Sequence, residues 1–143
     1  MRKFSSALKK IAASLSVCIL AAAAFVSLAC PVFCGYSGRR EVYFKDGSFS
    51  EGIRAEQELG FYDLIRGRQG EAITTDGETA EKIVKDLSAR LVFRESFSGG
   101  ENAYYYTEKL RYIREINGKR VNIQVCVTDS AVKVGTPMIY GGF

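Results

Sequence analysis

The sequence contains no histidine and no tryptophan. Without histidine the chain cannot build a Ser-His-Asp or Cys-His nucleophile pair, a histidine-containing zinc site or the usual side chain that titrates near neutrality. Nine phenylalanines and eight tyrosines must therefore supply the large aromatic side chains of a core. The 143 residues are enough for one ordinary domain once a targeting segment is set aside.

Acidic residues are absent from the first 29 positions, which hold four basic ones, Arg2, Lys3, Lys9 and Lys10. The net charge of +4 therefore belongs to this segment, because the rest of the chain has 16 basic and 16 acidic residues. A neutral surface exerts no general attraction on phosphate backbones. We therefore do not expect a nucleic acid as the partner.

The N-terminal segment has the pattern of an export signal. A basic start precedes an apolar run over residues 11–28, and Ser27 and Ala29 are small residues at the two positions that a signal peptidase inspects. We predict a signal peptide over residues 1–29, cleavage between Ala29 and Cys30, and an exported protein. The run is just long enough to cross ~30 Å of hydrocarbon, so an uncleaved leader that anchors the protein in the membrane is the alternative.

Three cysteines remain after this cleavage: Cys30, Cys34 and Cys126. Export permits a disulfide, and Cys30 with Cys34 could close a small loop. Their spacing is not a zinc pattern without a second pair of ligands. We predict neither a metal nor another cofactor.

The rest of the chain divides into a short linker over residues 30–40 and a single α+β domain over residues 41–143. We expect an edge strand over residues 41–45, a turn of helix over 53–59 and a strand over 59–66.

The clearest helical pattern lies between Thr75 and Arg90. Thr75 and Glu78 have the spacing of a capping box, and three acidic residues each stand four positions before a basic one. One apolar stripe has helical spacing and comprises Ala80, Ile83, Val84, Leu87 and Leu91. We predict that this stripe packs on a sheet.

After the helix the apolar period changes to two, which is typical of strands. We expect strands over residues 91–97, 103–107, 112–116, 121–127 and 131–134. Asn117-Gly118 is the sequence of a type I′ hairpin turn. These elements predict one amphipathic helix on a curved antiparallel β-meander.

The C-terminal half resembles the YwmB family, exported proteins of Gram-positive spore-formers. The resemblance rests on Ile116-Asn117-Gly118-Lys119, Val121-Asn122-Ile123-Gln124 and Val134-Gly135-Thr136-Pro137-Met138-Ile139. It implies a fold similar to that of the TATA-box-binding protein and a role that is not established. Members of that family are longer, and no functional residue is transferred from it.

Consecutive tyrosines and nearby basic residues form the candidate binding surface. In a strand, the three tyrosines must point to both faces, so at least one packs in the core and the others are exposed or half-exposed. The candidate residues are Tyr104, Tyr105, Tyr106, Arg111, Arg114, Arg120 and, beside them, Lys119. Such a surface can grip a protein or a glycan. Glu108, Glu115 and the neutral total argue against a nucleic acid.

These observations predict an exported, non-enzymatic module of the cell envelope that binds an unknown protein or wall component through one face of its sheet. The membrane would be a partner only through an uncleaved leader. The alternative is a small extracytoplasmic enzyme that uses Cys126 or acidic residues, although the sequence has no GxSxG, HExxH or P-loop motif.

Overall fold

The computed structural model describes residues 2–29, 31–45, 52–56, 59, 63 and 67–140. The chain divides into two compact units, residues 1–31 and residues 32–143.

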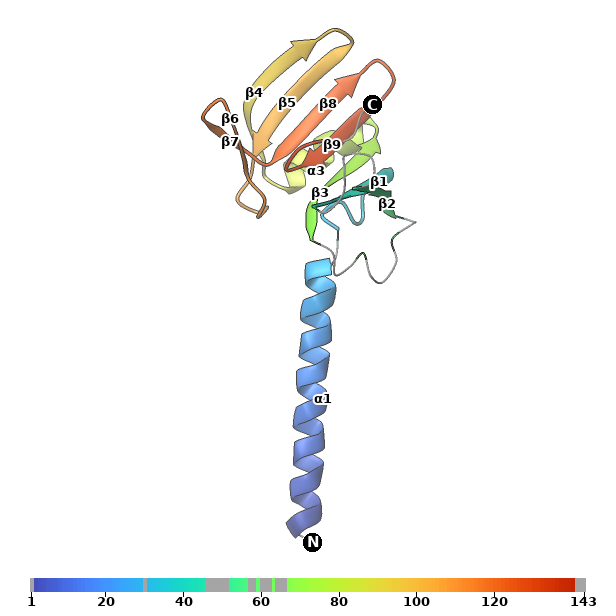
Figure 1. Ribbon diagram of the computed structural model, residues 1–143, viewed down its shortest axis with the longest axis vertical. Helices are drawn as coiled ribbons and strands as arrows, with labels where there is room; N and C mark the ends of the chain where they lie inside the picture. Colours follow the sequence, from blue (N-terminus) through green and yellow to red (C-terminus); the bar gives the residue numbers. More distant parts are fainter. Residues whose placement is uncertain are drawn as a thin grey trace. The chain divides into compact units, whose positions relative to one another are not determined.

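The first unit consists of one helix, α1 (Arg2–Ala29), drawn in blue in Figure 1. It covers the predicted leader, and the described side chains of its apolar run, such as Ile11, Leu15 and Leu20, are more than half exposed. No helix in the described residues meets the combined requirements of length and hydropathy for crossing a membrane.

The second unit is an α+β fold built on an antiparallel sheet of seven strands, in the order β2-β1-β3-β9-β8-β5-β4 (Figure 1). These strands are β1 (Arg39–Phe44), β2 (Ile53–Ala55), β3 (Arg68–Thr75), β4 (Arg90–Phe97), β5 (Gly100–Tyr106), β8 (Ile123–Thr128) and β9 (Val132–Thr136). A separate hairpin joins β6 (Arg114–Ile116) to β7 (Lys119–Val121). Helix α3 (Gly77–Asp86) belongs to the same unit.

Helix α3 packs its predicted apolar stripe on one face of the sheet. Ala80 and Ile83 are buried, and Val84 and Leu87 pack against the same core, which also contains the buried side chains of Phe33, Ile73, Ala103, Ile123, Val125 and Val134. Fully burying an aliphatic side chain contributes about 1.5–3 kcal/mol. This packing therefore holds the helix on the sheet.

The ends of α3 differ from the prediction. Asp76, and not Thr75, is the N-cap, and its Oδ1 accepts a hydrogen bond of 2.7 Å from the Thr79 backbone N–H. The helix ends at Asp86, because Ser88 takes a positive φ of 51°. Leu91 consequently lies in β4 and is 48% exposed.

The interval that we expected to be a linker belongs largely to the folded unit. Phe33 is 0% exposed in the core, and the Val32 backbone N–H donates a 2.6 Å hydrogen bond to Glu71 Oε2. Arg40 donates hydrogen bonds from Nη1 to the Phe33 and Tyr36 carbonyls. The segment that follows Pro31 is therefore anchored by burial and by backbone hydrogen bonds.

The strands before α3 also correct the prediction. β1 is not an edge strand, because β2 and β3 pair with its two sides. The expected helical turn at 53–59 begins instead with strand β2, and the strand expected at 59–66 lies mostly outside the described residues. The sequence analysis missed β3, whose fully buried apolar residues are Ala72 and Ile73.

The predicted meander is confirmed in part, because the strand expected at 112–116 lies in the separate β6–β7 hairpin and not in the seven-stranded sheet. β4, β5, β8 and β9 are neighbours, whereas the strand expected at 121–127 breaks at Asn122 between β7 and β8. The buried Asn122 side chain accepts a hydrogen bond from the Thr107 N–H at 2.9 Å and donates one to the Thr107 carbonyl at 2.6 Å. This amide therefore satisfies the backbone at the break.

The sheet face opposite α3 is also covered, in part by the segment after β9. Gln124 Oε1 accepts a hydrogen bond of 3.0 Å from the Ile139 N–H, and Gln124 Nε2 donates one of 2.9 Å to Asn102 Oδ1. Cys126, on the same face, is 0% exposed. The thiol named for the alternative enzyme is therefore shielded from solvent, because that face is itself buried around it.

The Asn117-Gly118 turn is confirmed by φ values of 51° and 72°. We expect Gly118→Val to destabilise the fold by ~1–3 kcal/mol, because a β-branched residue is strained at positive φ. An added Cβ meets no atom within 4 Å, so strain alone is measured. Urea denaturation checks the prediction, with Gly77→Ala in α3, which also has open space around it, as the control. An unchanged midpoint and slope for Gly118→Val would contradict it.

Candidate binding surface

Aromatic rings and cations meet on the sheet face opposite α3, where β4, β5 and the β6–β7 hairpin come together. The Cζ atoms of Arg90 and Arg120 lie 5.2 and 5.5 Å from the ring centroid of Tyr106. Lys119 Nζ lies 5.3 Å from the ring centroid of Phe93. We call these five residues the basic-aromatic cluster; these distances are those of cation–π contacts.

Strand register explains how the sequence builds this cluster. In the β4–β5 pair, Arg90 stands opposite Tyr106 and Phe93 stands opposite Tyr104. The rings of Phe93 and Tyr104 stack with their centroids 4.4 Å apart and an interplanar angle of 19°. The type I′ turn then carries Lys119 and Arg120 back toward these rings.

Two hollows in the surface adjoin the cluster. The larger has a volume of about 660 Å³ and is lined by Arg90, Leu91, Val92, Tyr106, Glu108, Gly118, Lys119 and Arg120. The smaller, of about 280 Å³, is lined by Ser88, Arg90, Tyr106, Thr107, Glu108 and Lys109. The two hollows share Arg90, Tyr106 and Glu108, so a ligand longer than one side chain can occupy both.

Within the described residues, the cations of the cluster have no acidic partner. Elsewhere in the folded unit basic side chains pair with acids, as Arg94 does with Glu101 at 2.5 Å. In the part of the chain that the structure describes, no acidic side chain forms an ion pair with Arg90, Lys119 or Arg120. Three exposed positive charges are therefore available to an anionic group.

Two titratable groups near the cluster have raised pKa values. Burial raises the pKa of the Tyr104 hydroxyl, and the Glu95 carboxylate raises it further. Burial also raises the pKa of the Cys126 thiol, against the opposing charge of Lys133. Both groups therefore stay protonated at neutral pH, which suits binding better than nucleophilic chemistry.

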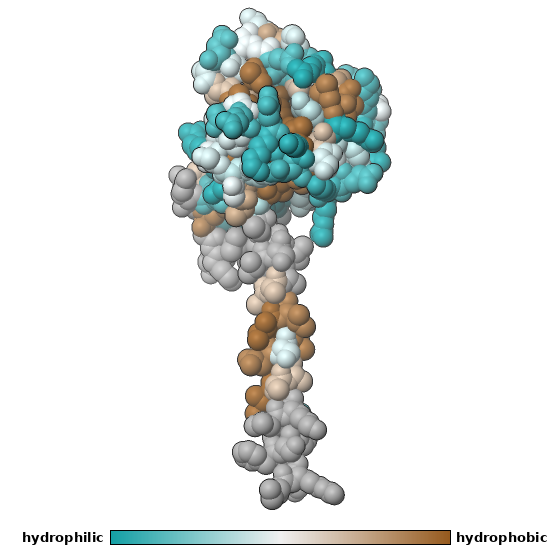
Figure 2. Space-filling view, turned by 180° about the vertical axis from the view of Figure 1, so that it is seen from behind, coloured by the Kyte–Doolittle hydropathy of each residue, from teal (hydrophilic) through white to brown (hydrophobic). Residues whose placement is uncertain are grey.

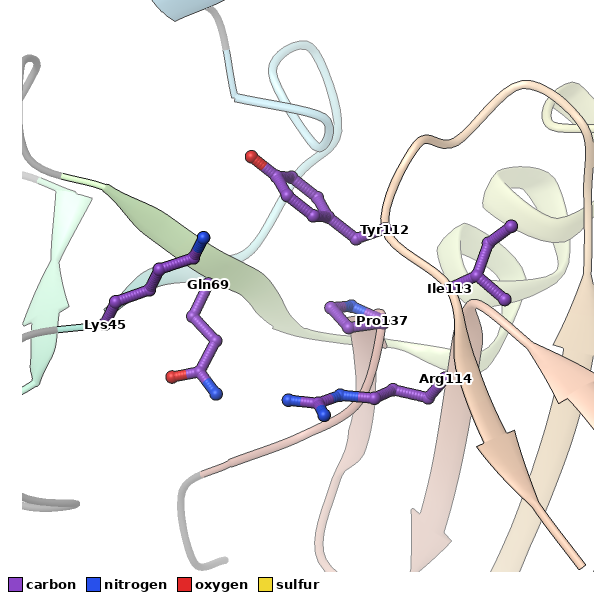
Figure 3. A pocket seen from close by; sticks show the side chains of 6 residues that line it. All are labelled: Lys45, Gln69, Tyr112, Ile113, Arg114 and Pro137. Carbon is purple, nitrogen blue, oxygen red and sulfur yellow. The ribbon is translucent and has the colours of Figure 1, made fainter.

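A third hollow, of about 260 Å³, lies on another part of the folded unit and is lined by Lys45, Gln69, Tyr112, Ile113, Arg114 and Pro137 (Figure 3). The Arg114 guanidinium donates hydrogen bonds of 3.0 and 3.1 Å to the Tyr140 hydroxyl and lies over that ring. Two cations, Lys45 and Arg114, line this hollow, against three in the basic-aromatic cluster, so the hollow offers an anion less positive charge.

The structure separates the residues that the sequence grouped as one surface. Tyr106 and Arg120 lie together in the cluster. Tyr104 is buried beneath Phe93, and Tyr105 packs against the core on the helix face, so the three tyrosines divide between faces as predicted. Arg114 lies at the third hollow and Arg111 is exposed. Of the predicted cleavage site, Ala29 ends α1 and Cys30 lies outside the described residues.

Sequence reasoning missed Arg90 and Phe93 as members of the site. It placed Arg90 in the helix, and even the register set by the Ser98-Gly99 turn would have put Arg90 opposite Thr107, because only the irregularity between Leu91 and Phe93 shifts Arg90 opposite Tyr106. Among the described residues, no group of three or more Cys, Asp and Glu side chains is arranged to hold a metal ion.

Searches against protein-family models, curated proteins and solved structures found no match for this chain.

Proposed function

We propose that this chain is an exported, non-enzymatic module of the cell envelope that binds an anionic group of a protein or wall component through the basic-aromatic cluster. The observation that carries the proposal is the convergence of Arg90, Lys119 and Arg120, which have no acidic partner in the described structure, on the rings of Tyr106 and Phe93. Cations beside aromatic faces bind anions while the rings supply contact area.

The hydropathy of one face of the folded unit bears on the kind of partner. On the face shown in Figure 2, hydrophilic residues make up most of the described surface of the folded unit, and apolar residues form separate patches. A large apolar patch would favour a hydrophobic partner. The three cations of the basic-aromatic cluster instead favour a partner that offers negative charge and hydrogen-bond acceptors.

The proposed location rests on the leader over residues 1–29, with its basic start and apolar run. We further propose that the folded unit is a YwmB-like domain related in fold to the TATA-box-binding protein. What supports this is an antiparallel sheet with α3 packed on one face, together with the C-terminal motifs. Among the described residues, the sheet has seven strands and α3 packs on it.

The charge distribution favours a protein or wall ligand over a nucleic acid. Glu108 lines both hollows of the cluster, and residues 30–143 carry as many acidic as basic side chains. A phosphate backbone requires a broad positive field, whereas the cluster offers three charges. Enzymatic use of Cys126 is disfavoured by its burial and its raised pKa.

Capture of envelope material by the full chain tests the proposal. We expect cell-envelope extracts of the producing organism to contain a component that binds the wild type and is held about tenfold or more weakly by Arg90→Gln/Lys119→Gln/Arg120→Gln, because each charged hydrogen bond contributes about 1.5–3 kcal/mol. The matched control is Lys45→Gln/Lys85→Gln/Arg111→Gln, which removes three exposed cations elsewhere. An equal loss of binding in both variants would show that the component binds through non-specific charge. No loss of binding in either variant would exclude the cluster as the binding site.

A further inference from the structure

One edge of the seven-stranded sheet is long and open. β4 forms this edge, has eight residues and pairs only with β5 among the described strands (Figure 1). The opposite edge is β2, with three residues. An edge strand presents a row of unpaired backbone N–H and C=O groups, which another extended chain can satisfy.

β4 carries three charged residues, Arg90, Arg94 and Glu95, but it remains able to pair along most of its length. It contains no proline, and its pairing with β5 is irregular only between Leu91 and Phe93, near its start. Leu91 and Phe97 are 48% and 43% exposed. From Phe93 to Phe97 the strand is therefore a regular, solvent-exposed template for an added strand.

The basic-aromatic cluster lies beside this edge. The 660 Å³ hollow is lined on one side by Arg90, Leu91 and Val92 of β4, and on the other by residues 118–120 of the hairpin turn. A strand added to β4 therefore passes the three unpaired cations. Successive side chains of a strand point to opposite faces, so alternate residues of that strand would face the cluster.

We propose that β4 receives an extended acidic segment of a partner protein as an additional strand, with acidic side chains on alternate residues directed at Arg90, Lys119 and Arg120. This inference rests on the proposed function, because it uses the same cations, and it narrows the partner to a polypeptide. The partner segment is acidic because it must complement the three cations of the cluster. It is a polypeptide because a wall polymer has no regular ladder of amide groups to pair with the open edge of β4.

The test uses the full chain in mild detergent and a fluorescent peptide of alternating Glu and Thr, about ten residues long to match β4. Two further peptides carry N-methyl groups, one on every Glu and one on every Thr. In an added strand only alternate N–H groups face the sheet. We therefore expect one methylated peptide to bind as well as the parent and the other to bind about 10- to 100-fold more weakly, as the loss of several hydrogen bonds predicts.

Two further readouts complete the test. The amides of β4 should gain protection from hydrogen exchange when the parent peptide binds, and Arg90→Gln/Lys119→Gln/Arg120→Gln should weaken that peptide. Equal binding of both methylated peptides, or no saturable binding up to about 1 mM, overturns the added strand. Concentration-dependent pairing of two chains through β4 without peptide also overturns it. In each of these cases the proposed function still stands if the envelope extracts contain a ligand whose capture depends on the cluster. If the extracts contain no such ligand either, both the added strand and the proposed function are refuted.

Discussion

Replacing Phe33 with alanine should lower the free energy of unfolding by about 3–5 kcal/mol, the cost of truncating a fully buried phenylalanine. Phe33 is 0% exposed and packs in the core that contains Ile73 and Ile83. The deletion leaves a cavity that the neighbouring sheet and helix cannot fill completely. Chemical denaturation of the full chain, followed by circular dichroism, measures the change.

The matched control is Phe97→Ala at the far end of β4. This phenylalanine is 43% exposed, so its removal forfeits less apolar burial, and we expect a loss of less than about 1.5 kcal/mol. Comparable small effects at both positions would mean that the segment after Pro31 is not part of the core. A large effect at Phe33 alone would establish that the cooperative unit begins before β1.

Local signals in the sequence predicted the elements that depend on local physics. The stripe formed by Ala80 and Ile83 requires only helical spacing, and the Asn117-Gly118 turn requires only residues that tolerate positive φ. Both could therefore be predicted from neighbouring residues, and both are confirmed. β3 was missed because its sequence is largely polar although it is an interior strand. Gly70 and Glu71, for example, are buried between neighbouring strands. Their burial depends on pairing with β1 and β9, which no local pattern reveals.

The predicted linker failed for a related reason. One phenylalanine in a short mixed segment gives no periodicity, and the bond from the Val32 N–H to Glu71 joins positions 39 residues apart. Similarly, the alternation in β8 correctly separates Ile123 and Val125 from Gln124 and Cys126. It could not show that the chain after β9 would contact Gln124, or that Cys126 would be buried.

The candidate site was predicted in part. Tyr106 and Arg120 were named because an aromatic strand and a basic hairpin lie close in sequence. Arg90 depends on where the helix ends, and that end is set by Ser88 and by packing. Arg114, the first residue of β6, lines the third hollow instead of the cluster. Its side chain is held there by hydrogen bonds to the Tyr140 hydroxyl.

Lys133→Met should also lower the free energy of unfolding by about 3–5 kcal/mol at neutral pH, because it leaves a buried carboxylate without its main partner. Lys133 Nζ lies 2.9 Å from Glu41 Oε2, and the two side chains are 6% and 12% exposed. The remaining partner, Arg39, is 72% exposed and weakly coupled. Arg94→Met, which breaks an exposed pair with Glu101, is the control and should cost less than about 1 kcal/mol.

The pH dependence separates a charge effect from a packing effect. Burial alone would raise the pKa of Glu41, but the hydrogen bond and charge of Lys133, with those of Arg39, hold it below its ordinary value of 4.5. In the wild type this carboxylate therefore stabilises the fold fully above about pH 4.5, and that contribution is lost as the pH falls through the lower folded pKa. In Lys133→Met burial should dominate and raise the pKa of Glu41.

Acidification should therefore reduce the difference in the free energy of unfolding between the wild type and Lys133→Met. As the pH falls toward 4.5 the variant recovers stability, because protonation of Glu41 removes a partly buried charge that only Arg39 still partners. The wild type keeps its ion pair with Lys133 until the pH is lower still and then loses it. Glu41→Gln/Lys133→Met should recover most of the loss at neutral pH, since it replaces the carboxylate with a neutral amide of similar shape. A loss of the same size at every pH, unrelieved in the double variant, would assign the role of Lys133 to packing of its aliphatic stem rather than to its charge.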